Sequence, residues 1–149
     1  MTTWQEFAAE APALAAFGQE RLTQRIAYLA TVRPDGAPRV HPVSPFIGQG
    51  HLFVFMEPTS PKGHDLQRDS RYALHCAVED NQGGGGEFYL SGRARLVEAV
   101  DLRQIAVQAA TKVVYTPEER YILFELGLKE VLSTVYDEHG PVRRRWQAR

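Results

Sequence analysis

The stretch that decides the fold is residues 25–66, RIAYLATVRPDGAPRVHPVSPFIGQGHLFVFMEPTSPKGHDL. Three apolar, β-rich segments in it predict strands over 25–32, 38–47 and 51–56. Turn signals join them, Pro34-Asp35-Gly36 first and Gly48-Gln49-Gly50 second. Because tight turns connect antiparallel neighbours, we expect these strands to form an antiparallel sheet.

A small polar loop follows the third strand and enters a helix predicted over residues 62–69. The loop reads Thr59-Ser60-Pro61-Lys62-Gly63. A hydroxyl, a lysine and free backbone N–H groups at a helix start are the donors that bind phosphate groups in proteins. The loop therefore predicts a site for a phosphate-bearing cofactor, held on the sheet.

The flanking segments predict peripheral helices and further strands. Thr3 and Glu6 have capping-box spacing, so a helix should begin near Trp4 and be broken or kinked at Pro12. After residue 66 we expect strands over 72–79 and 87–98 joined by a flexible glycine-rich connection at 80–86, helices over 101–112 and from Thr116 to about Leu126, and a final hairpin of strands 130–136 and 142–147.

These elements define a fold class that is mainly β with peripheral helices. Six or seven strands joined mostly by short turns predict an antiparallel barrel, with an N-terminal helix and helices between the later strands. A single domain should cover residues 1–149. Strand 38–47 contains Pro38, Pro42 and Pro45, which have no N–H group to donate. We therefore expect it to be irregular, bulged or partly at an edge.

Composition narrows the choice of partners. The chain has 17 basic and 18 acidic residues, which argues against nucleic acid or an anionic membrane as a partner. The basic run Arg143-Arg144-Arg145 is interpreted as a solvated strand face. The single cysteine, Cys76, lies in an apolar run and should be a buried thiol. Without an apolar stretch of about 20 residues or a secretory signal, we expect a cytoplasmic protein.

The sequence offers no catalytic constellation of its own. It has no Gly-x-Ser-x-Gly, no His-Glu-x-x-His and no paired-cysteine site, and its five histidines are scattered singly. We therefore predict no metal site and name no catalytic residue. A bound cofactor that carries the chemistry itself is consistent with this pattern.

The pattern as a whole resembles a known family. It reads LATV-x-PDG-x-PRVHPV over residues 29–43, then an apolar strand, then S-x-K-x-x-x-L over 60–66, and YLSGRARLVE over 89–98. In order and spacing it is similar to the pyridoxamine 5′-phosphate oxidase-like family. The resemblance implies an FMN-binding split β-barrel that forms a homodimer, with the flavin in a groove between the subunits.

The resemblance also implies roles for particular residues. Ser60 and Lys62 match the positions that bind the flavin phosphate, whereas Pro61 stands where family members often carry a further basic residue. Arg39 or His41 takes the basic position of the second strand, and His41 is favoured because Val43 then follows on the same face. The ring system would be lined by backbone groups of Pro42, Val43, Ser44, Phe55 and Met56, and Trp146 would either cover a cofactor edge from the partner subunit or be a buried interface tryptophan.

The function implied is an FMN-dependent oxidoreductase acting on an unidentified small molecule. The resemblance does not extend to vitamin B6 oxidation, because the spacing of Arg143 to Arg145 does not match the basic residues that hold that substrate. The nearest alternative is a deazaflavin-dependent reductase on the same barrel. A non-catalytic flavin-binding protein, a haem-binding relative and a barrel with a degenerate site are the other readings.

Overall fold

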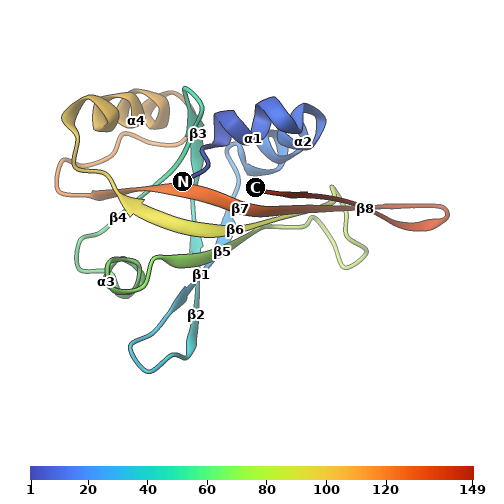
Figure 1. The fold of residues 1–149 in the computed structure, drawn as a ribbon, viewed down its shortest axis with the longest axis horizontal. Helices are drawn as coiled ribbons and strands as arrows, with labels where there is room; N and C mark the ends of the chain where they lie inside the picture. Colours follow the sequence, from blue (N-terminus) through green and yellow to red (C-terminus); the bar gives the residue numbers. More distant parts are fainter.

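The computed structural model describes residues 1–149 as one eight-stranded antiparallel sheet with four helices (Figure 1). The helices are α1 (Trp4–Glu10), α2 (Pro12–Leu22), α3 (Pro61–Arg68) and α4 (Val100–Val113). The strands are β1 (Ala27–Val32), β2 (Pro38–Val43), β3 (Phe46–Gly48), β4 (His51–Met56), β5 (Arg71–Cys76), β6 (Glu87–Leu96), β7 (Ile122–Asp137) and β8 (Gly140–Gln147).

The order of the strands makes the sheet curl toward itself. It runs β2-β1-β5-β6-β7-β4-β3, and β8 pairs with β7 beside this path. The two ends of the path, β2 and β3, are joined in the chain by only Ser44 and Pro45. Two linking residues span no more than about 11 Å between the flanking Cα atoms, so the two ends of the sheet lie close together. The predicted fold class, an antiparallel split barrel with peripheral helices, is confirmed.

The prolines explain why the barrel opens where it does. β2 pairs with β1 alone, so Pro38 and Pro42 lie in a strand at the end of the sheet. Pro45 falls in the link and divides the predicted strand 38–47 into β2 and β3. The expectation of an irregular edge strand is confirmed, and this division is why the sheet has eight strands instead of six or seven.

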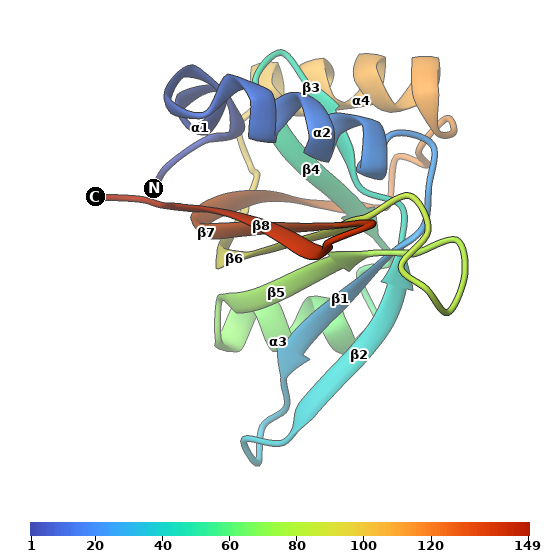
Figure 2. The ribbon, with the colours of Figure 1, turned by 90° about the vertical axis from the view of Figure 1, so that its right-hand side faces the viewer.

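The helices lie on opposite sides of the sheet. Figures 1 and 2 show α1, α2 and α4 on one side, and α3 on the other side near β1 and β5. The main apolar core includes Phe7, Leu29 and Leu66 from three of these elements. A second, smaller core lies beneath α4, where Ala106 and Ala110 pack near Phe53. None of the four helices combines the length and apolar character needed to cross a membrane.

One helix prediction differs from the structure. The helix predicted from Thr116 to about Leu126 is wrong, because β7 already begins at Ile122 and residues 115–121 form no helix. Leu123 and Leu126 are buried on opposite faces of β7, which pairs with both β4 and β6. This tertiary pairing outweighs the local capping signal. The predicted break of the N-terminal helix is confirmed, because α1 ends at Glu10 and α2 begins at Pro12.

The glycine-rich segment is the hairpin connection that the sequence predicts. It joins the antiparallel strands β5 and β6. Gly85 and Gly86 have φ values of +80° and +85°, and any side chain there would overlap Arg21 and the ring of Phe17. The glycines therefore let this connection lie directly on α2.

A bulge interrupts the pairing of β6 with β7. Ser91 pairs with Glu130 and Gly92 with Leu128, so Lys129 is an extra residue in β7. A Cβ atom at Gly92 would overlap the carbonyl oxygen of Gly127. The two strands therefore approach each other at a distance that only glycine permits.

Replacing Gly92 by alanine should lower the free energy of unfolding by about 1–3 kcal/mol, because the new methyl group forces the strands apart. Ser91→Ala is the matched control, since it adds no atom and should change stability by less than about 0.5 kcal/mol. Urea denaturation of both variants measures the difference. A Gly92→Ala protein as stable as the wild type would contradict the close approach.

Candidate functional site

The start of α3 presents unused donors, as the sequence predicts for a phosphate site. The Ser60 side chain caps the helix, its oxygen accepting the N–H of Gly63 at 3.2 Å. Its hydroxyl hydrogen remains free to donate. Pro61 is the first helical residue, and the Lys62 N–H donates to no backbone carbonyl. The helix dipole adds partial positive charge at this end.

Lys62 is the cation at this helix start. Its side chain is half-buried, and no carboxylate pairs with its ammonium group. Burial without a charge partner lowers the pKa of Lys62 below its ordinary value of 10.5. An anion bound here would supply the missing partner.

A buried carboxylate, Asp65, attaches α3 to the sheet. It is 1% exposed and accepts hydrogen bonds from Arg39 Nε at 2.7 Å, Thr31 Oγ1 at 2.8 Å and Arg68 at 3.1 Å. Burial by itself would raise the pKa of Asp65. The three hydrogen bonds outweigh burial and hold the pKa below its usual value of 3.8.

Arg39 and His41 lie on the same face of β2, two residues apart. They pair with Thr31 and Leu29 of β1, on the face that α3 covers. The guanidinium of Arg39 is committed to Asp65, whereas the imidazole of His41, which is half-buried, makes no side-chain hydrogen bond. Both sequence candidates therefore point to the α3 side, and only His41 is without a partner.

Arg39 and Arg68 form a basic cluster around the carboxylate of Asp65, and Lys62 is a third cation one turn earlier on α3. Lys62 lies three residues before Asp65 on α3 and Arg68 three residues after it, so the three side chains occupy one face of the helix. The three cations outnumber the one carboxylate. Asp65 pairs with the two arginines, so Lys62 is left without a counter-charge.

The segment from Pro42 to Ser44 lies where the sheet opens. Pro42 is exposed on the outer face, Val43 is buried and Ser44 is half-buried. Because β2 pairs only with β1, the backbone groups on its other edge have no strand partner. Ser44 also lines a cavity of about 320 Å³ together with Ile26 and Val114, near the end of α4.

Phe55 and Met56 end β4 beside this opening. β3 pairs only with His51 to Phe53, so the backbone edge at residues 54–56 is free on that side. The Met56 side chain points to α3, since its sulfur would lie 3.2 Å from a Cβ atom at Gly63. The Phe55 ring points to the α4 side and stacks on Phe46 with 5.8 Å between centroids. Their backbone groups, not their side chains, are therefore free to meet a ligand.

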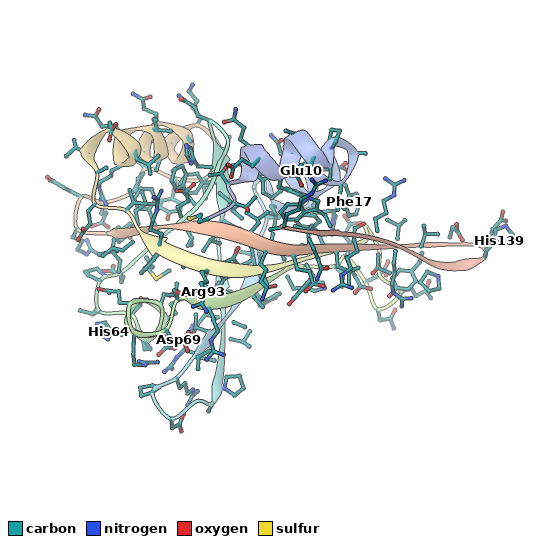
Figure 3. All side chains as sticks on the ribbon, viewed as in Figure 1. Glu10, Phe17, His64, Asp69, Arg93 and His139 are labelled. Carbon is teal, nitrogen blue, oxygen red and sulfur yellow. The ribbon has the colours of Figure 1, made fainter.

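Trp146 is not brought to the start of α3. It packs on Phe7 with 4.9 Å between ring centroids, and its indole N–H donates to Glu10 at 2.7 Å. Figure 3 shows Glu10 on the α1–α2 side of the sheet, while His64 of α3 lies on the opposite side. Within one chain Trp146 is thus a core residue that secures α1 to β8.

Sequence reasoning missed Thr31, Asp65 and Arg68, which hold the helix in place. One signal was present for Thr31, because it continues the buried face of Ala27 and Leu29 in β1. A hydroxyl on an otherwise apolar strand face requires a buried polar partner. The identity of that partner depended on how α3 packs, which the local pattern does not specify.

The fold and the site now define the class of protein. The sequence pattern of the pyridoxamine 5′-phosphate oxidase family matches residues 12–131, and the chain belongs to this family. No curated protein matches the chain in a sequence search.

Solved structures with this fold carry differing descriptions. A haem-binding protein from Mycobacterium smegmatis has a TM-score of 0.65 and 19% identity, with 88% of this chain and 57% of that chain covered. HutZ, a haem storage protein from Vibrio cholerae, has a TM-score of 0.61 and 19% identity, with 80% and 89% covered. A NimC/NimA family protein from Clostridium acetobutylicum has a TM-score of 0.58 and 16% identity, with 87% and 94% covered. These similarities show the fold alone.

Replacing Asp65 by asparagine should lower the free energy of unfolding at pH 7 by about 3 kcal/mol, because Arg39 loses its buried counter-charge. The folded-state pKa of Asp65 is depressed, so its stabilising contribution is complete above about pH 4 and is lost as the pH falls through the folded pKa. Wild type should therefore lose stability on acidification more steeply than Asp65→Asn.

Urea denaturation from pH 2 to pH 7 measures both effects. Glu20→Gln, an exposed carboxylate change on α2, is the control and should behave like the wild type. Parallel pH profiles for wild type and Asp65→Asn would show that the carboxylate does not hold α3 in the way described.

Proposed function

We propose that the protein binds FMN at the start of α3 and acts as a flavin-dependent oxidoreductase on a small molecule. The observation that carries this proposal is the half-buried, unpaired ammonium of Lys62 beside the Ser60 cap. The unbonded Lys62 amide and the surplus of cations around Asp65 add to it. Membership of the family supports a flavin phosphate as the anion.

The residues present fit the phosphate of a flavin. The hydroxyl of Ser60, the amide of Lys62 and its ammonium group would bind the phosphate, and His41 would contribute from β2. Pro61 offers neither a charge nor an N–H group. The further positive charge would come from Arg39 and Arg68, which both pair with Asp65. Free backbone groups at Pro42, Ser44, Phe55 and Met56 would orient the ring system.

When bound, the flavin supplies hydride and electron transfer, and the chain's own residues bind and orient it. No histidine, cysteine or carboxylate group of the chain is proposed as a catalytic acid or base. The substrate is therefore distinguished by how it packs beside the cofactor, not by a charged residue dedicated to its chemistry.

We also propose that two copies of the chain enclose the cofactor. The outer face of the β1–β2 hairpin carries Tyr28, which is 47% exposed, and Val40, which is 62% exposed, with Pro42 beside them. Apolar side chains that lie together on an uncovered sheet face favour burial against a partner. A second copy on this face would also exclude water from the free edges of β2 and β4.

Two other ligands are distinguishable from FMN. A deazaflavin also carries a phosphate and would use the same basic cluster. Haem is the second candidate because two proteins of similar fold are described as binding or storing it, and the free imidazole of His41 is a group that ligates iron. FMN, deazaflavin and haemin titrated in parallel into the purified protein separate these cases by their absorbance changes. Flavin binding without turnover by NADH or NADPH would identify a non-catalytic flavin-binding protein.

Lys62→Ala should weaken FMN binding by about 1.5–3 kcal/mol, the value of a charge-assisted hydrogen bond, and leave the fold intact. The matched control is His64→Ala, an exposed side chain on the same helix, which should bind FMN as the wild type does. Fluorescence titration of FMN measures all three affinities. Equal affinities for wild type and Lys62→Ala would place the flavin phosphate elsewhere, and no flavin binding at all would refute the proposed function.

Val40→Asp should convert the proposed dimer into a monomer, because it buries a charge at the interface without disturbing a side chain that is already exposed in the single chain. Val142→Asp, on the exposed face of β8, is the control and should stay dimeric. Light scattering at low micromolar concentration distinguishes the two. A wild-type protein that is a folded monomer under these conditions would contradict the shared site.

A further inference from the structure

A cavity of about 590 Å³ lies apart from the start of α3, at the bulge between β6 and β7. Ser91, Gly92, Leu128 and Lys129 line it where the two strands separate. Its volume is in the range of pockets that bind small molecules, about 300–1,000 Å³. None of the residues assigned to the flavin contributes to it.

Positive charge dominates the lining of this cavity. The basic residues are Arg71, Arg93, Lys129 and Arg149, and the one acidic residue is Glu6. The Glu6 carboxylate is already engaged, because it accepts the backbone N–H of Thr3 at 2.7 Å in the helix cap. The cavity therefore has a surplus of cations in a chain whose net charge is only −1.

Three of these four cations, Arg93, Lys129 and Arg149, form no ion pair with a carboxylate, whereas the fourth does. Arg71 is neutralised by Asp69 at 2.7 Å. Arg93, in contrast, donates to the hydroxyl of Ser70 at 3.1 Å and to no acidic group. The acidic neighbour of Lys129, Glu130, pairs instead with Arg145 at 2.9 Å. Arg93 and Lys129 are thus available to an incoming anion.

The bulge is what presents Lys129 to the cavity. Because Lys129 is the extra residue of β7, its side chain does not follow the usual alternation between the two faces of the strand. Leu128 and the ring of Tyr72, whose hydroxyl donates to the Gly127 carbonyl at 2.9 Å, also line the cavity but are buried in the core. The apolar surface open to a ligand comes from Met1, which is exposed, and Ala148, which is half-buried. Ser91 adds a hydroxyl that bonds to no other side chain. Cations beside accessible apolar side chains suit a ligand that is both anionic and partly apolar.

We propose that this cavity is a second ligand site, for a small organic anion that carries a phosphate or carboxylate group on an apolar body. Arg93 and Lys129 bind the anionic group, the Ser91 hydroxyl donates to it, and the apolar body lies against Met1 and Ala148. The site is independent of the proposed flavin site. A polyanion such as nucleic acid is disfavoured, because the positive charge is confined to the lining of one small cavity.

Calorimetric titration with phenyl phosphate, at constant ionic strength, tests the proposal. The wild type should bind phenyl phosphate saturably and more tightly than inorganic phosphate, because the ring covers the apolar side chains of Met1 and Ala148. Arg93→Gln and Lys129→Gln should each weaken binding by about tenfold or more. Both side chains are exposed, so neither change disturbs the core. Arg143→Gln, an exposed cation of β8 outside the cavity, is the control and should leave binding unchanged.

Two further measurements separate this site from the flavin site. Phenyl phosphate should still bind to Lys62→Ala and to protein saturated with FMN. Benzoate, titrated in parallel, tells a carboxylate ligand from a phosphate ligand by which probe binds more tightly. Equal affinity in wild type, Arg93→Gln and Lys129→Gln would overturn the proposal, as would absence of saturable binding or loss of binding in Lys62→Ala. The comparison of wild type with Arg93→Gln and Lys129→Gln does not depend on whether the protein binds flavin.

Discussion

The buried carboxylate of Asp65 is the interaction on which the arrangement of the proposed site depends. It joins β1 through Thr31 and β2 through Arg39, while its own helix starts with the Ser60–Lys62 loop. A buried charge without such partners would cost several kcal/mol. The helix therefore has one position at which Asp65 is satisfied, and that position sets where Ser60 and Lys62 lie relative to His41.

The same carboxylate explains how two arginines can lie close together. Arg39 and Arg68 both donate to Asp65, so their mutual repulsion is reduced by the charge between them. Lys62 lies one turn earlier on α3 and receives no such compensation, which is why burial lowers its pKa. Lys62 is thus left without a counter-charge. In the proposed site, the phosphate of the flavin would supply it.

Local signals in the sequence predicted the parts of this site that are local in the chain. The Ser60 cap, Pro61 at the first helical position and the free Lys62 amide follow from five consecutive residues. The bond between Arg39 and Asp65 joins residues 26 apart and depends on how α3 docks, so no short pattern specifies it. The helix predicted over 116–126 was wrong for the same reason, because a short pattern does not specify which distant strands pair. Thr116 to Glu119 have the residues of a helix start. The chain from Ile122 onward instead forms β7, which lies between β4 and β6 and pairs with both.

Two groups of basic residues lie near the two ends of α3. At the N-terminal end the helix dipole favours an anion, and the cation there, Lys62, is the unmatched one. At the other end Asp69 follows the last helical residue and pairs with Arg71 of β5, which already lines the second cavity. Figure 3 shows Asp69 and Arg93 together at this end. Asp65 pairs with Arg39 and Arg68, and Asp69 pairs with Arg71. These ion pairs fix the position of α3 between two groups of basic residues. The remaining cations, Lys62 at one end and Arg93 and Lys129 at the other, have no carboxylate partner. They are the basis of the two anion sites proposed for this chain, whose net charge is close to zero.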